Sequence, residues 1–132
     1  MKNGIKKNGK VNGFEKVNSN DKKHVLFVVP PGVPFQDLQN PDPSKSFGYI
    51  VSSIPMGVLS LGGYIRKNSN TKVSVLDMNV HVRDEMKPGV DWNKFLEKCM
   101  LKKVGTENID ILGISAIFNV SAGYLESIAS IS

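Results

Sequence analysis

The chain has 132 residues, 40% of them hydrophobic and 22% charged, which is enough for one ordinary soluble globular domain. Its single cysteine excludes an internal disulfide and fits a reducing, cytoplasmic compartment. The formal net charge of +5 arises in residues 1–23, so the rest of the chain is neutral and no nucleic-acid surface is expected on it. No apolar run is long enough to span a membrane.

Residues 1–23 differ in composition from the rest of the chain. They are rich in lysine, asparagine and glycine and lack the apolar stretch of a secretory signal. We expect a disordered basic tail over 1–23, followed by a single folded domain over 24–132.

The first predicted strand occupies Val25–Val29, inside the stretch from His24 to Pro34. Five consecutive apolar residues, three of them valines, favour a strand that is covered on both faces, as in a parallel sheet. Pro30 and Pro31 end this strand because neither can donate to a sheet ladder. The following loop therefore begins at the carboxyl end of a central strand, where open α/β sheets bind their ligands.

A long connection over 30–53 contains five of the seven prolines. The first helix is expected to start at Ser52 or Ser53, with Pro55 in its first turn. Its predicted apolar face has helical spacing: Val58, Leu61, Gly62 and Ile65, widened by Leu59. Gly62 and Gly63 are costly in a helix, which indicates a close backbone approach to the sheet or to a ligand.

Two further strand–helix units follow. The second strand is predicted over 72–76 with Asp77 at its end, then a loop over 77–89 and a helix capped by Asp91. The buried stripe of that helix is predicted from its spacing: Trp92, Phe95, Leu96, Cys99 and Met100. The third strand is predicted over 109–117, with Asp110 at its start, before a last helix that begins near Asn119 or Ser121.

This order predicts an α/β domain: a Rossmann-like parallel sheet of flavodoxin-like order with helices on both faces. Doubly wound sheets usually have five or six strands, whereas three are predicted here. We therefore expect a fragment truncated after the third strand–helix unit, or a half-domain that leans on another chain.

The common catalytic and phosphate-binding motifs are missing from the sequence. It contains neither the dinucleotide-binding glycine motif nor the P-loop motif. His24 and His81 do not stand in a metal-ligand spacing, so structural or solvent-facing histidines are expected. Four loops are expected to share one sheet edge: 30–34, 53–57, 77–79 and 115–119. They carry few charges, which suits a large, flat and mostly neutral cofactor.

Four segments together carry a resemblance to a known family. They are Val25–Pro31, Pro55–Arg66, Val73–Asp77 and Asp110–Ser115. In this order and spacing they resemble the cobalamin-binding domain at the amino end of cobalamin-dependent radical S-adenosylmethionine (SAM) enzymes. The resemblance covers about residues 24–132.

The resemblance implies that cobalamin lies against the carboxyl edge of the sheet, with its nucleotide tail beside the strands. The cofactor-binding residues implied are Pro30, Pro31, Gly32, Met56, Gly57, Asp77, Met78, Ser115 and Ala116. Other cobalamin domains place a cobalt-ligating histidine after the first strand, where this chain has Pro-Pro-Gly-Val-Pro, so binding without a lower histidine is expected. The iron–sulfur cluster, SAM and the chemistry, often methyl transfer, would belong to a following barrel domain.

Two alternative functions remain open from the sequence. The first is an α/β interaction domain with a vestigial cofactor site, whose sheet edge contacts only a neighbouring domain. The second is a flavodoxin-like domain that binds flavin or another nucleotide, which would require a phosphate loop rich in glycine and hydroxyl groups after the first strand. The prolines at 30 and 31 argue against the second alternative.

Overall fold

The computed structural model describes residues 22–40, 42, 44, 47, 50, 54–115 and 122–131. Its elements are, in chain order, β1 (His24–Val29), α1 (Phe35–Gln39), α2 (Met56–Asn68), β2 (Lys72–Asp77), α3 (Met78–Glu85), α4 (Trp92–Val104), β3 (Ile111–Ile114) and α5 (Ala122–Ile131). The predicted basic tail lies outside the described residues, except for its last two, Lys22 and Lys23.

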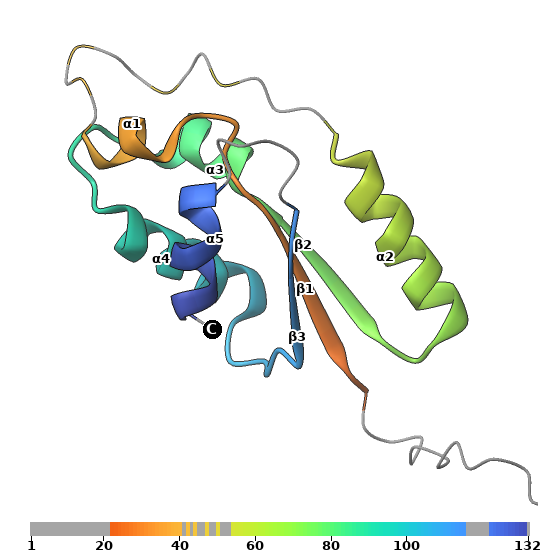
Figure 1. Cartoon of the computed structure of the whole chain (residues 1–132). Coiled ribbons are helices and arrows are strands. Elements are labelled where there is room, and N and C mark those ends of the chain that lie inside the picture. The colour runs from red at the N-terminus through yellow and green to blue at the C-terminus, as the bar shows by residue number, and fades with distance from the viewer. Residues whose placement is uncertain are drawn as a thin grey trace, which may run out of the picture.

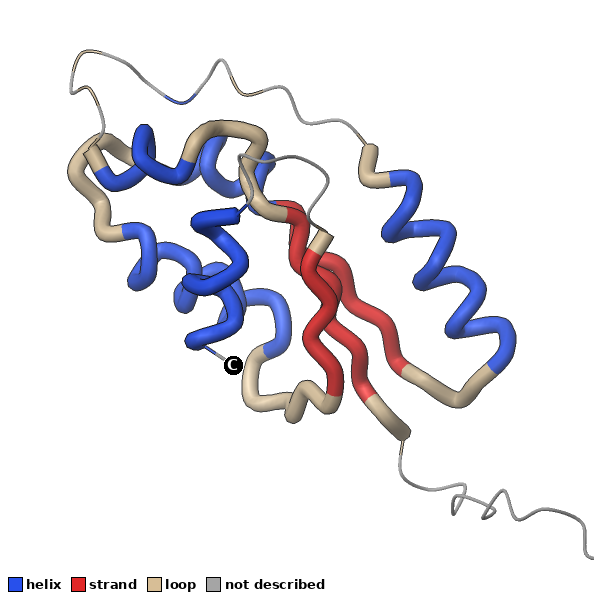
Figure 2. Tube along the Cα trace, viewed as in Figure 1, coloured by secondary structure: helices blue, strands red, loops and turns tan. Residues whose placement is uncertain are grey.

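The three strands form one parallel sheet in the order β2-β1-β3. Val25 pairs with Val73 of β2 on one side and with Ile111 of β3 on the other. Figure 1 shows the three strands running in the same direction, and Figure 2 shows them side by side. The predicted α/β class, with β1 in the centre of a parallel sheet, is confirmed.

Helices cover both faces of the sheet. Figure 1 shows α2 on one side and α3, α4 and α5 on the other. On the α2 side, Val25, Phe27 and Val29 form a small core with Val58. On the opposite side, Leu26 and Val28 belong to a larger core that includes residues of α3, α4 and α5. Successive residues of β1 thus face alternate cores, which explains its unbroken apolar sequence.

Two glycines allow close packing against the sheet. A Cβ atom at Gly62 would lie 3.1 Å from the Val73 side chain, so the predicted close approach of α2 is confirmed there. At Gly63 nothing lies within 4 Å of such an atom, so Gly63 makes no close approach to the sheet. At Gly113 in β3 a Cβ atom would lie 2.5 Å from the Phe27 ring, which therefore occupies the space beside β3.

The structure adds two helices that the sequence analysis did not predict. Helix α1 lies inside the long connection after β1, where Leu38 is buried in the larger core. Helix α3 occupies most of the predicted 77–89 loop and starts directly after β2, because the Asp77 side chain accepts a hydrogen bond from the Asn79 backbone N at 3.0 Å. Such short helices show too few turns for a recognisable apolar stripe.

Helix α2 also differs from its prediction. It begins at Met56 with Pro55 at its N-cap, whereas Ser52 and Ser53 lie outside the described residues. Val58 and Gly62 are buried, but Leu59 and Leu61 are 45% and 49% exposed, so the predicted apolar face was too wide.

The predictions for α4 are confirmed. Asp91 caps this helix by accepting a hydrogen bond from the Lys94 backbone N at 2.9 Å. All five residues of its predicted stripe are buried: Trp92, Phe95, Leu96, Cys99 and Met100. The third strand is shorter than predicted, with Asp110 just before it as expected. The predicted start of the last helix lies outside the described residues.

Candidate functional site

The carboxyl ends of the three strands meet at one edge of the sheet, as a parallel arrangement requires. This carboxyl edge is followed by the Pro30–Pro34 loop after β1, by the start of α3 after β2, and by Ser115 after β3. The Ser115 backbone N donates to the Val28 O at 3.0 Å, so the first residue after β3 stays tied to the central strand. The described parts of three predicted loops, at 30–34, 77–79 and 115, therefore share this edge.

The loop after β1 is held by the side chain of Asn79. Its Oδ1 accepts a hydrogen bond from the Gly32 backbone N at 2.6 Å, and its Nδ2 donates to the Pro30 backbone O at 3.2 Å. The same Nδ2 also donates to Oδ1 of Asp77 at 3.0 Å. One side chain thus links the loop after β1 to the end of β2.

A second contact holds this loop from the side of β3. The hydroxyl of Tyr124 in α5 donates to the Val33 backbone O at 2.8 Å, and the Tyr124 side chain is fully buried. Its ring makes edge contacts with Phe35 and Trp92, at centroid distances of 5.0 and 5.1 Å. The indole Nε1 of Trp92 donates to Ser127 at 2.7 Å. Through this aromatic cluster the chain after β1 packs against α4 and α5.

The predicted site residues fall into two groups at this edge. Gly32 is exposed there, while Asp77 and Ser115 are half-buried. Three others are buried and pack into the protein: Pro30, Pro31 and Met78.

The remaining predicted site residues lie at α2 or outside the described part. Met56 and Gly57 are exposed at the start of α2, and Met56 keeps 64% of its surface accessible. Ala116 lies outside the described residues.

Asn79 and Tyr124 were missed as site residues by the sequence analysis. Asn79 is two residues after Asp77, a spacing at which side chains often bond nearby backbone groups, so that spacing was a weak local signal. Tyr124 falls within the predicted last helix, and its partner Val33 is 91 positions away in sequence. Contacts of that range cannot be inferred from periodicity.

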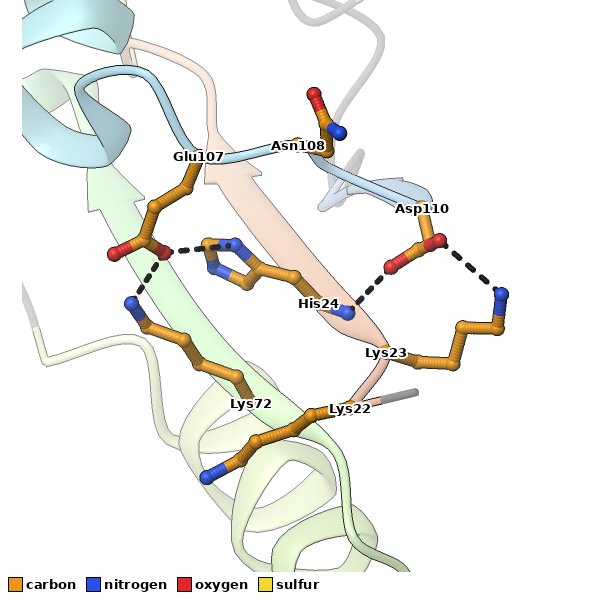
Figure 3. A pocket seen from close by; sticks show the side chains of 7 residues that line it. All are labelled: Lys22, Lys23, His24, Lys72, Glu107, Asn108 and Asp110. Carbon is orange, nitrogen blue, oxygen red and sulfur yellow. Dashed lines mark hydrogen bonds and ion pairs between the residues drawn. The ribbon is translucent and has the colours of Figure 1, made fainter. Parts of the chain in front are cut away.

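A polar cavity of about 480 Å³ lies at the opposite, amino edge of the sheet. Figure 3 shows the side chains that line it: Lys22, Lys23, His24, Lys72, Glu107, Asn108 and Asp110. The imidazole of His24 is buried, with Nε2 2.9 Å from the Ser74 hydroxyl and Nδ1 3.3 Å from a Glu107 carboxylate oxygen. Lys72 contacts the same oxygen of Glu107. The predicted structural role of His24 fits this position.

Two carboxylates of this cavity join the strands. Asp110 accepts from the His24 backbone N at 2.8 Å, and this bond, together with Lys23, lowers the pKa of the Asp110 carboxyl. The hydrogen bond from Lys72 lowers the pKa of Glu107, and His24 adds to the effect. These contacts link β1, β2 and the segment before β3. We therefore interpret the residues at the amino edge as stabilising the sheet.

His81 and Cys99, whose side chains can also bind metals, are engaged or buried. His81 on α3 lies 2.8 Å from a Glu85 carboxylate oxygen, and this contact lowers the pKa of Glu85. Cys99 is 1% exposed, and burial raises the pKa of its thiol. Within the described ranges, no three histidine, cysteine or acidic side chains are grouped to hold a metal ion. None of the helices described there has the length and apolarity to cross a bilayer.

Comparisons with known proteins do not assign this chain to a family. No protein family, curated protein or solved structure gave a match. The β2-β1-β3 parallel sheet with helices on both faces is consistent with a flavodoxin-like or Rossmann-like arrangement.

Proposed function

We propose that this chain is a cobalamin-binding module of a radical SAM enzyme, of the methyltransferase type, and that it is not catalytic on its own. The observation that supports this most is the convergence of three parallel strand ends on a nearly neutral edge. The iron–sulfur cluster and SAM would be supplied by a separate barrel domain acting on the bound cobalamin.

The residues at the carboxyl edge suit a large neutral ring. Gly32 is exposed and has no side chain, so a flat ligand can approach the backbone of the loop closely. Asp77 is a charged group at this edge, and the backbone N and side-chain Nδ2 of Asn79 donate hydrogen bonds to its carboxylate. We assign contacts with the corrin to Gly32 and Asp77, and contacts with the nucleotide tail to Ser115. Pro30, Pro31 and Met78 would support these groups from beneath.

The histidines support binding without a lower histidine ligand. His24 begins β1, at the edge opposite the proposed site, and is enclosed by Ser74 and Glu107. His81 contacts Glu85 along α3. Neither imidazole stands in the Pro30–Pro34 loop, which is where a cobalt-ligating histidine would be required.

The experiment that tests this proposal is retention of the cofactor. The full chain is incubated with hydroxocobalamin, freed of unbound ligand by gel filtration, and examined by visible absorption. We expect about one corrin per chain, and no retained flavin mononucleotide in a parallel sample. A folded chain, verified by circular dichroism, that retains no corrin would overturn the proposal.

One observation favours the alternative of an interaction domain. Helix α2 carries several large apolar side chains that are mostly accessible: Ile54 just before it at 71%, Met56 at 64% and Tyr64 at 67%. Exposed apolar groups gathered on one element often mark a protein interface. A folded chain that binds neither corrin nor flavin would support this second function.

A further inference from the structure

The Pro-Pro-Gly sequence after β1 restricts how the loop can be held. Pro30 and Pro31 have no backbone N–H, so Gly32 supplies the first N–H donor after Val29. That donor bonds to Oδ1 of Asn79. The contact is therefore the first hydrogen bond that the loop can donate once it leaves the sheet.

The amide of Asn79 fits its surroundings in one orientation. Its oxygen faces an N–H group, from Gly32, whereas its nitrogen faces two acceptors, the Pro30 carbonyl and the Asp77 carboxylate. Rotating the amide by 180° would place oxygen against both acceptors. The side chain thus joins loop and strand end with a defined geometry.

We propose that Asn79 is a positioning residue for the ligand site. Its side chain holds the Pro30–Pro34 loop in the shape that the corrin binds. This inference rests on the proposed function. A loop that is already ordered loses less conformational freedom when a ligand binds, so removing this support should weaken binding. Tyr124 supports the same loop through Val33, but its full burial makes it a part of the core as well.

Three variants separate this role from general stability. Asn79→Ala removes all three side-chain bonds. Asn79→Asp keeps an acceptor for Gly32 but loses both donated bonds, so it serves as a second variant should alanine prevent folding. The matched control is Asn68→Ala, which removes an exposed amide that donates to the Tyr64 backbone O at 2.8 Å, at the end of α2.

Affinity for hydroxocobalamin is measured with the full chain. Trp92 is its single tryptophan, and quenching of its emission by the corrin reports binding. We expect Asn79→Ala to raise Kd about tenfold, Asn79→Asp to raise it as well, and Asn68→Ala to leave it unchanged. In the ligand-free protein, the Gly32 amide should exchange faster in Asn79→Ala, while the urea midpoint stays close to that of Asn68→Ala.

The possible results distinguish the two proposals. Wild-type binding with an unchanged Kd in a folded Asn79 variant would overturn the positioning role and leave the proposed function standing. Weaker binding without faster Gly32 exchange would also overturn it, because the loop would not be the intermediary. A folded wild-type chain that binds no corrin would overturn the proposed function, and the role of Asn79 would fall with it.

Discussion

Asp110 illustrates how single residues at the amino edge stabilise the sheet without taking part in the proposed site. Its carboxylate accepts from the His24 backbone N, and its own backbone N donates to the His24 O at 2.9 Å. These two hydrogen bonds connect the first residue of β1 to the residue before β3. Because the bond to the carboxylate favours its charged form, it lowers the pKa of Asp110.

This lowered pKa predicts a pH dependence of stability. The folded state binds fewer protons than the unfolded state in the acid range, so the contribution of Asp110 is present above about pH 4 and is lost as pH falls further. We expect Asp110→Asn to lose less Tm than wild type between about pH 6 and about pH 3, because asparagine does not titrate. Glu97→Gln, at an exposed position of α4, is the control. Equal acid sensitivity of Asp110→Asn and wild type would contradict the assignment.

Residue-level prediction succeeded where the cause is local. The capping role of Asp91 depends on a backbone amide three positions away, and the sequence predicts it correctly. The bond from Gly32 to Asn79 spans 47 positions, and the bond from Tyr124 to Val33 spans 91. Such contacts depend on the sheet order, which a single sequence does not specify.

At the scale of the elements, glycines determine how closely neighbours pack. Gly113 in β3 leaves space for the Phe27 ring of β1. Gly63 faces open space on the exposed side of α2. The same residue type therefore has opposite consequences for stability in the strand and in the helix.

A pair of alanine substitutions tests this contrast. Gly113→Ala should destabilise the protein by about 1–3 kcal/mol, because the added Cβ overlaps the Phe27 ring. Gly63→Ala should stabilise it by about 0.5–1 kcal/mol, since alanine is the better helix former and meets no neighbour. Urea unfolding of both variants measures the two changes. Two shifts of the same sign would show that the packing around these glycines is wrong.

Prediction of the elements was most accurate for long, regular segments. The spacing in α4 identifies all five buried residues, and the apolar run identifies β1. Helices α1 and α3 were missed because five and eight residues are too few to establish a period. In α2 the predicted apolar face included Leu61, which is exposed. Among the described helices, α2 lies alone on its side of the sheet, so only the side chains that face the sheet are buried.

For the whole molecule, the position of β1 between β2 and β3 determines which edge of the sheet we propose as the ligand site. The chain crosses from one side of β1 to the other between β2 and β3, which places a switch of direction at the carboxyl edge. The sequence predicts the parallel class from its strand–helix order. The sequence does not predict which side chains reach this edge. Pro31 and Met78 were predicted there but are buried, whereas Asn79, which was not predicted, contacts the loop after β1.

The most direct measurement is a map of the ligand on the folded chain, by two-dimensional ¹H–¹⁵N NMR during titration with hydroxocobalamin. We predict that the amide signals of Gly32, Asn79 and Ser115 shift, while those of His24 and Asp110 at the opposite edge stay unchanged. Shifts concentrated at His24 and Asp110, or no shifts in a folded protein, would contradict a corrin site at the carboxyl ends of the strands.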